Sequence, residues 1–122
     1  MYIPFLVSKI HSARVTDTDL NYSGSISIDE EIAEKANLRE FQKVEIYNIT
    51  NGNRFSTYVL LSERGSKKII LNGAAAHLVN KGDRIIVAAY AYIDEVELNS
   101  LNAKILILDE KNNIEKIING KL

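Results

Sequence analysis

The sequence predicts a single, mainly β domain folded as a small barrel with short helices. Its apolar runs are short, evenly spaced and rich in β-branched and aromatic residues, which is typical of strands. The length of 122 residues suits one domain, here 1–122. One proline, at position 4, and the lack of any low-complexity stretch leave no linker. We expect about seven strands and two small helices, an arrangement typical of a compact barrel.

The first half of the chain is expected to form four strands and a helix. Alternating or β-branched runs predict strands at 5–15, 25–28, 43–49 and 54–61. A helix is predicted at 29–37, with Asp29 as its N-cap and two glutamates in its first turn. Asn51-Gly52 predicts a tight hairpin with a type I′ turn, in which both central residues take positive φ.

The second half continues the same pattern. A strand is predicted at 68–71, and 72–77 is expected to be a strand end that runs into a short helical turn. The nearly continuous apolar run 85–92 predicts a central strand that is buried on both faces. Residues 94–101 could be helix or loop, and 103–108 with 114–118 are expected to form a last hairpin.

Composition excludes several classes of function. The absence of cysteine excludes a disulfide framework, a thiolate metal site and a cysteine nucleophile. A net charge of −1 gives no electrostatic reason to expect nucleic acid. No apolar run approaches the roughly 20 residues that span a bilayer. The N-terminus has no basic segment before its apolar stretch, so we expect no secretion signal and a cytoplasmic location.

Histidine offers no convincing metal site. The only two histidines, His11 and His77, are isolated from each other in the sequence. Each is more simply explained as a surface histidine or a hydrogen-bonded one than as a ligand. No glycine-rich phosphate or dinucleotide motif is present either.

Gly24-Ser25 is the first candidate for chemistry. The chain has a second Gly-Ser pair, Gly65-Ser66, so the dipeptide alone is weak evidence. Gly65-Ser66 lies in a polar turn, whereas Gly24-Ser25 immediately precedes a strand that begins at Ile26. There, Gly24 could hold a strained backbone, and the hydroxyl of Ser25 would be placed to attack the neighbouring carbonyl. The alternative is a plain turn before a strand.

Two further segments could bind a ligand. On the predicted strand 54–61, Arg54 and Tyr58 share a face with Ser56, while Thr57 points to the other face unless a bulge intervenes. An arginine and a tyrosine on one face can bind a carboxylate and offer a proton, or simply form a surface pair. In the segment 72–76, small side chains could leave backbone N–H groups open to an anion, or could allow tight packing against a strand.

Together, these segments resemble the pyruvoyl-dependent aspartate 1-decarboxylase family. The matching strings occur in the family's order over about residues 1–92: SKIH (8–11), VT (15–16), DLNYSGSISID (19–29), NGNRFSTY (51–58), ERGS (63–66), LNGAAA (71–76) and GD (82–83). Two positions depart from the family pattern, since Ser12 stands where a basic residue is common and Tyr47 where tryptophan is common. Neither of them carries the reaction, and the tail after residue 92 adds little to the match.

The resemblance implies a cofactor that the chain makes from itself. Ser25 Oγ would attack the Gly24 carbonyl, and the chain would break through an ester and a dehydroalanine into residues 1–24 and 25–122. Residue 25 would remain as a pyruvoyl group. This ketone would form a Schiff base with L-aspartate and accept the electrons released with CO₂. The product, β-alanine, would supply pantothenate and hence coenzyme A biosynthesis.

The resemblance also assigns roles to residues. Ser25 is the pyruvoyl precursor, Tyr58 is the proton donor, and Lys9 and Arg54 hold the carboxylates of the substrate. Thr57 contacts substrate and also supports the cleavage at Gly24-Ser25. The remaining matches are the backbone of Gly73, Ala74 and Ala75, which contacts substrate, and three supporting residues, His11, Tyr22 and Asn72.

The family fold is a double-psi β-barrel, and the enzyme is a homotetramer with sites at subunit interfaces. The resemblance implies no metal, nucleic acid or membrane, and leaves open whether maturation needs a partner protein. Two alternatives stay open at this point. One is a non-catalytic small β-barrel that binds or regulates and is not cleaved. The other is activity on glutamate, because one methylene gives only about 1–3 kcal/mol of discrimination.

Overall fold

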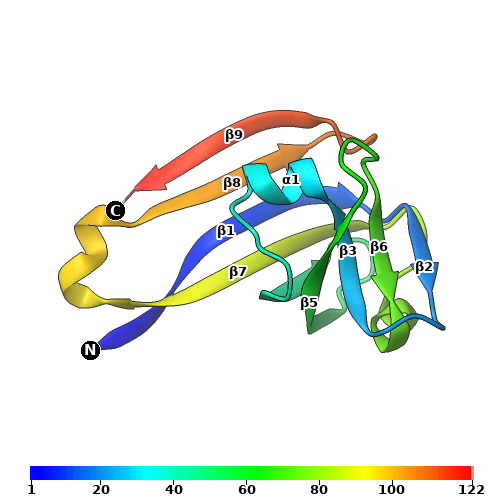
Figure 1. The fold of residues 1–122 in the computed structure, drawn as a ribbon, viewed down its shortest axis with the longest axis horizontal. Helices are drawn as coiled ribbons and strands as arrows, with labels where there is room; N and C mark the ends of the chain where they lie inside the picture. Colours follow the sequence, from blue (N-terminus) through cyan, green and yellow to red (C-terminus); the bar gives the residue numbers. More distant parts are fainter. Residues whose placement is uncertain (122) are drawn as a thin grey trace.

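The computed structural model describes residues 1–121 and is mainly β, as predicted (Figure 1). The strands are β1 (Tyr2–Arg14), β2 (Asp17–Asp19), β3 (Ser25–Asp29), β4 (Lys43–Asn48), β5 (Arg54–Ser62), β6 (Ile69–Asn72), β7 (Arg84–Asp94), β8 (Asn102–Leu108) and β9 (Ile114–Lys121). The helices are α1 (Glu30–Lys35) and two 3₁₀ helices, η1 (Gly73–Leu78) and η2 (Glu95–Ser100). The predicted helix with its Asp29 cap and the predicted hairpin of β8 and β9 are both confirmed.

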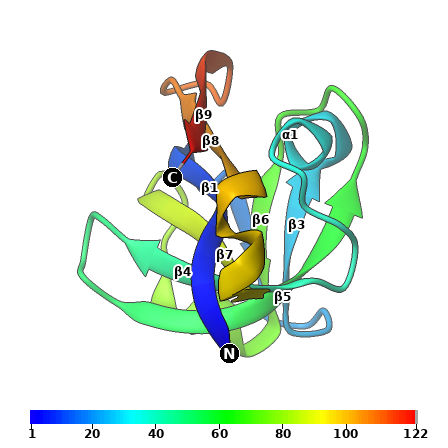
Figure 2. The ribbon, with the colours of Figure 1, turned by 90° about the vertical axis from the view of Figure 1, so that its left-hand side faces the viewer.

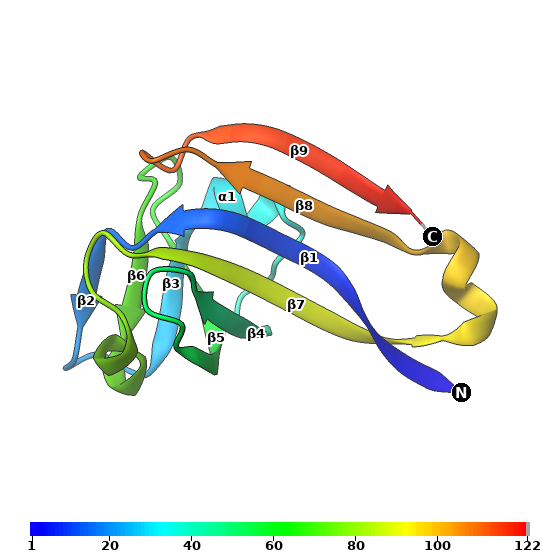
Figure 3. The same ribbon diagram turned by 180° about the vertical axis from the view of Figure 1, so that it is seen from behind.

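The strands form one curved sheet in the order β2-β6-β3-β5-β4-β7-β1-β8-β9. Beyond the end of β1, the N–H of Val15 donates to the carbonyl of Asp83, and the N–H of Thr16 donates to the carbonyl of Ile69. These two hydrogen bonds join distant parts of the sheet. This arrangement is consistent with the predicted small barrel, whose double-psi crossings stay a prediction. The long strands β1, β7, β8 and β9 extend past the part that holds β2, β3 and β6 (Figures 1 and 3).

The core combines buried side chains of the strands with Ile32 and Ala33 of α1, and Figure 2 shows α1 beside β3. Its largest fully buried side chains are mostly isoleucines that alternate along the strands: Ile10, Ile26, Ile28, Ile46, Ile69, Ile85, Leu71 and Leu106. Each such side chain contributes about 1.5–3 kcal/mol when removed from water. None of the helices in residues 1–121 is long and apolar enough to cross a membrane.

The predicted type I′ turn at Asn51-Gly52 is wrong. Strands β4 and β5 do form a hairpin, but their last pair is Tyr47 with Arg54, so the loop is six residues long. Gly52 has φ +82°, whereas Asn51 does not have positive φ. The cause is Asn48, whose carbonyl accepts from the N–H of Gly52 and whose side-chain oxygen accepts from that of Thr50. These bonds wind the chain into a wider loop.

The prediction that 85–92 is buried on both faces holds only in part. Strand β7 is central, between β4 and β1, and is buried from Val87 to Ala89. Beyond them, Tyr90 is 47% exposed and Tyr92 is 74% exposed. Here β7 continues alongside β1 past the edge of the core, so tyrosines can face water.

Asp29 links α1 to the turn between β5 and β6. Its buried carboxylate accepts from the N–H groups of Glu31 (2.8 Å), Gly65 (3.0 Å) and Lys67 (2.8 Å). Burial alone would raise the pKa of Asp29, but these backbone N–H groups favour the ionised form and lower it overall. The residue is therefore both a helix cap and a clamp on the turn.

Acid should weaken the fold through Asp29. Because the pKa of Asp29 is lowered in the folded state, the ionised group contributes stability at neutral pH, which is lost as the pH falls through the folded pKa. Urea unfolding at neutral pH and at about pH 3 should show wild type losing more free energy of unfolding than Asp29→Asn. Glu63→Gln, exposed on the same turn, should behave like wild type. An equal loss in wild type and Asp29→Asn would contradict this assignment.

Candidate functional site

Ser25 begins β3 and lies in the middle of a hydrogen-bonded group. It pairs with Asn72 of β6 in the sheet, and its side chain is fully buried. The hydroxyl donates to the carbonyl of Ser23 (2.9 Å) and accepts from the side-chain amide of Asn72 (2.9 Å). Asn72 donates a second bond, to the hydroxyl of Ser27 (3.0 Å). Both hydrogens of the Asn72 amide are thus used to fix the two serines of β3.

Strain at Gly24, which the sequence suggested, is not observed. Gly24 does not have positive φ, and a Cβ built on it would meet only the carbonyl oxygen of Asn72, at 4.0 Å. The constrained glycine is instead Gly73, which has φ +63°. A Cβ on Gly73 would lie 2.6 Å from Gly24 Cα and 2.9 Å from the carbonyl oxygen of Tyr22. At Gly73, therefore, tight packing is what the structure shows, and it fixes the backbone just before Ser25.

A shallow hollow opens beside this contact. Its lining comes from the Gly24 link, from β5 and from η1, and we call it the Gly24 hollow: Gly24, Phe55, Ser56, Thr57, Tyr58, Ala74, Ala75 and Leu78. Strand β5 pairs with β4 without a bulge, so Arg54, Ser56 and Tyr58 share one face and Thr57 lies on the other, as predicted. The ring of Tyr58 lies 6.3 Å from that of Phe41, centroid to centroid.

Arg54 lies outside this hollow, near the start of β5. Because Ile26 pairs with Val59, Ser25 lies level with Tyr58, and Arg54 is four residues, or about 13 Å, further along the strand. Its guanidinium stacks over the ring of Tyr47 at 3.9 Å. Among residues 1–120, whose side chains the structure describes, Arg54 forms no ion pair.

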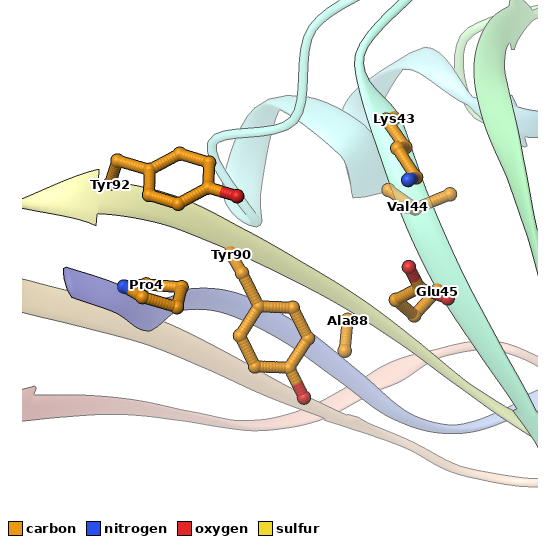
Figure 4. A pocket seen from close by; sticks show the side chains of 7 residues that line it. All are labelled: Pro4, Lys43, Val44, Glu45, Ala88, Tyr90 and Tyr92. Carbon is orange, nitrogen blue, oxygen red and sulfur yellow. The ribbon is translucent and has the colours of Figure 1, made fainter.

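The hydroxyl of Tyr47 is itself held by a second tyrosine. It lies 2.9 Å from the hydroxyl of Tyr90 on β7. That hydrogen bond is the larger cause of a raised pKa of Tyr47, and burial of the hydroxyl is the next. Tyr90 also lines a second hollow between β1, β4 and β7 (Figure 4). None of the predicted site residues lines this second hollow. Its lining residues are Pro4, Lys43, Val44, Glu45, Ala88, Tyr90 and Tyr92.

Lys9 and His11 lie on β1 and do not line the Gly24 hollow. Lys9 is on β1, paired with Ala88 of β7 and Ile105 of β8, and three strands separate β1 from β3 in the sheet. The Nδ1 atom of His11 is buried and has no hydrogen-bond partner among residues 1–121. Burial, then the positive charges of Lys9 and Arg84, lower the pKa of His11, so its ring is neutral at neutral pH. One chain therefore does not bring Lys9 or His11 into the Gly24 hollow.

The structure thus brings together most of the predicted site but not all of it. One group surrounds the Gly24-Ser25 bond: Tyr22, Gly24, Ser25, Thr57, Tyr58, Asn72, Gly73, Ala74 and Ala75. Lys9, His11 and Arg54 stand apart from it. Sequence reasoning missed Ser27 and the carbonyl of Ser23. The alternation of Ser25 and Ser27 on one strand face was the signal that could have identified Ser27.

The comparisons with known proteins decide the family. The family model described as aspartate decarboxylase matches residues 1–115. The chain belongs to this family. It is 55% identical over 118 residues to the aspartate 1-decarboxylase of Sulfurimonas denitrificans, covering 97% of this chain and 98% of the relative. The protein of that name from Wolinella succinogenes is 56% identical over 117 residues, covering 96% and 97%.

A Clostridium botulinum aspartate 1-decarboxylase is 52% identical over 119 residues, covering 98% of this chain and 94% of the relative. The family match therefore continues past residue 92, where the sequence resemblance was expected to end. Strand β8, which begins at Asn102, pairs in parallel with β1 from Ser8 to His11 and so flanks Lys9. The tail contributes to the surroundings of a predicted site residue.

Proposed function

We propose that this chain is an aspartate 1-decarboxylase, a lyase that converts L-aspartate into β-alanine and CO₂ by means of a pyruvoyl group made from its own Ser25. The family match supports the overall reaction. The observation that carries the proposal is the buried Ser25 hydroxyl, held by Ser23 and Asn72 next to an exposed Gly24. Gly24 lines the Gly24 hollow, so a group that forms at position 25 would lie directly beside it.

The cleavage step uses residues already in contact. Ser25 Oγ adds to the carbonyl carbon of Gly24, and the nitrogen of Ser25 leaves as an amine, which converts the amide into an ester. Loss of the Ser25 α-proton then expels the Gly24 carboxylate and leaves dehydroalanine. Water replaces the nitrogen, which departs as ammonia, and a ketone remains. Asn72 orients Oγ, Gly73 fixes the Gly24 backbone, and Thr57 in the hollow supports the step.

Other residues of the chain bind and protonate the substrate. The pyruvoyl group supplies an electron sink for the decarboxylation. Lys9 and Arg54 bind the two carboxylates of aspartate, Lys9 as a point charge and Arg54 with its planar fork. The phenol of Tyr58 gives a proton to the carbon that has lost CO₂. Thr57 and the backbone of 73–75 contact the substrate at the hollow.

The separation of Lys9 from the hollow supports a site shared between copies of the chain. Three strands lie between the strand of Lys9 and that of Ser25, and Lys9 does not line the Gly24 hollow, so a Lys9 from a neighbouring copy would complete the site. We therefore propose a homotetramer with sites at subunit interfaces. We also propose a cytoplasmic enzyme that supplies β-alanine for pantothenate biosynthesis, with neither nucleic acid nor membrane as a partner.

The test is the intact mass of the purified protein under denaturing conditions. Two species, residues 1–24 and a pyruvoyl-capped 25–122, are expected. Borohydride added with aspartate should then attach substrate-derived mass to the longer species. A chain that stays whole after warming and after incubation with cell lysate would instead support a non-catalytic binding or regulatory module. An adduct on a lysine would point to a lysine-based mechanism.

Tyr58→Phe should separate cleavage from catalysis. The variant keeps the ring that packs against Phe41, so its folding and its cleavage at Gly24-Ser25 should be normal. Its kcat for aspartate should fall about 100-fold or more, because the proton donor is gone. Tyr92→Phe, on the exposed part of β7, is the matched control and should keep full activity. Full activity in Tyr58→Phe would mean that another group donates the proton.

A further inference from the structure

The C-terminal end of η1 receives a convergence of side-chain amides. The carbonyl of Leu78, at the last residue of η1, accepts from Asn53 (3.1 Å), Asn51 (3.2 Å) and Asn48 (3.4 Å). All three asparagines lie in the loop that joins β4 to β5 or at its edge. We call these three side chains and the Leu78 carbonyl the amide clamp. N–H donors are favoured here, because the last carbonyls of a helix carry partial negative charge and lack partners within the helix.

In two of the clamp residues, Asn48 and Asn51, the side-chain oxygen accepts a hydrogen bond within the loop, while the side-chain nitrogen donates to Leu78. The Asn48 oxygen accepts from the N–H of Thr50 (2.9 Å), and the Asn51 oxygen accepts from the N–H of Asn53 (2.9 Å). Asn48 is buried and also donates to the carboxylate of Asp83 (2.9 Å). The oxygens thus shape the loop, whereas the nitrogens of Asn51 and Asn53 reach out to η1. This division explains why the loop is wider than a type I′ hairpin.

The clamp acts on η1, which forms one side of the Gly24 hollow. At its N-terminal end, η1 places Gly73 against Gly24, and along its length it presents Ala74 and Ala75 to the hollow. The loop that carries the clamp leads directly into β5, which contributes Phe55 to Tyr58 to the same hollow. We propose that Asn51 and Asn53 are positioning residues that hold η1 against β5, so that the Gly24-Ser25 bond and the substrate contacts stay aligned. This inference rests on the proposed function.

Asn51→Asp with Asn53→Asp is the decisive pair of changes. Aspartate keeps the oxygen of Asn51 that shapes the loop but removes the N–H groups that reach Leu78. Hydrogen exchange of the backbone amides of 73–79 should become faster, roughly fivefold for each bond lost. Conversion to the two-chain form should slow, and KM for aspartate should rise, while kcat of the matured fraction stays near that of wild type.

A pH profile distinguishes positioning from general loss of structure. A protonated carboxyl group regains an O–H donor for the Leu78 carbonyl. The cleavage and KM defects of the double variant, relative to wild type, should therefore shrink as the pH falls from about 7 toward about 4, near the ordinary pKa of an aspartate side chain. Asn80→Asp is the matched control, because it adds a charge two residues beyond Leu78, and no hydrogen bond within residues 1–121 uses the Asn80 side chain.

Unchanged exchange at 73–79 in the double variant would overturn the proposal. Faster exchange with wild-type cleavage and wild-type KM would also overturn it, because η1 would then be loosened without effect on the site. Equal defects in Asn80→Asp would attribute the effect to charge alone. Wild type that neither cleaves nor acts on aspartate would reject the proposed function, whereas the exchange result would still decide whether the clamp orders η1.

Discussion

Ser25→Ala should remain a single chain of 122 residues and produce no β-alanine from aspartate. The substitution removes the one atom that can convert the Gly24-Ser25 amide into an ester, and with it the source of the ketone. The backbone of β3 should be unaffected, because alanine fits a buried strand position and the change removes only a hydroxyl. Intact mass under denaturing conditions and a β-alanine assay measure the two outcomes directly.

Ser27→Ala is the control for this variant. Ser27 accepts the second N–H of the Asn72 amide (3.0 Å), just as Ser25 accepts the first (2.9 Å). Each variant therefore deprives Asn72 of one partner, but only Ser25→Ala removes the nucleophile. We expect Ser27→Ala to be cleaved and active. A two-chain product from Ser25→Ala would mean that the cleavage does not start from this hydroxyl.

What could be predicted from the sequence depends on the distance over which each signal acts. The strand at Ser25 follows from alternation of neighbouring residues, and the cap at Asp29 follows from residues within one helical turn. The grouping of Arg54 and Tyr58 on one face likewise needs only the period of a strand. Such features are determined within about ten residues, and here they were predicted correctly.

The rest depends on contacts between segments that are far apart in the chain. Asn72 meets Ser25 only because β6 and β3 pair in a particular register, 47 residues apart. At the start of the wide β4–β5 loop, the side-chain amide of Asn48 also donates to the carboxylate of Asp83, 35 residues away. A turn motif as local as Asn51-Gly52 carries no information about that bond. Register between distant strands is a property of the whole core, so the sequence pattern alone does not determine it.

Lys9 illustrates a third limit. The alternation along β1 predicts a strand, but it does not reveal that β7 and β8 flank Lys9 on both sides or that three strands separate β1 from β3. The resemblance to a family placed Lys9 in a site, and one chain does not bring it there. The proposed site shared between copies of the chain would reconcile the two, and no pattern within a single chain encodes such a site.

Gly73→Ala should have the second largest effect on the cleavage of the chain, because the new methyl group would overlap neighbouring backbone atoms. Its Cβ would lie 2.6 Å from Gly24 Cα, 2.7 Å from Gly24 N and 2.9 Å from the carbonyl oxygen of Tyr22. All three are backbone atoms, so no side-chain rotation can relieve the overlap. Either η1 or the segment that leads to Ser25 must shift. At about 2 kcal/mol for overpacking, conversion to the two-chain form should slow at least about 30-fold.

Gly82→Ala separates this clash from ordinary backbone strain. Gly82 also has positive φ, +93°, but a Cβ there would meet no atom within 4 Å. Both variants therefore place alanine in a left-handed conformation, at a cost of about 1–2 kcal/mol. Only Gly73→Ala also collides with Gly24. Thermal unfolding should show both variants destabilised, while mass spectrometry over time should show Gly82→Ala cleaving at close to the wild-type rate. Folded Gly73→Ala that cleaves as fast as Gly82→Ala would show that close contact between η1 and the Gly24 backbone is not needed to prepare the bond.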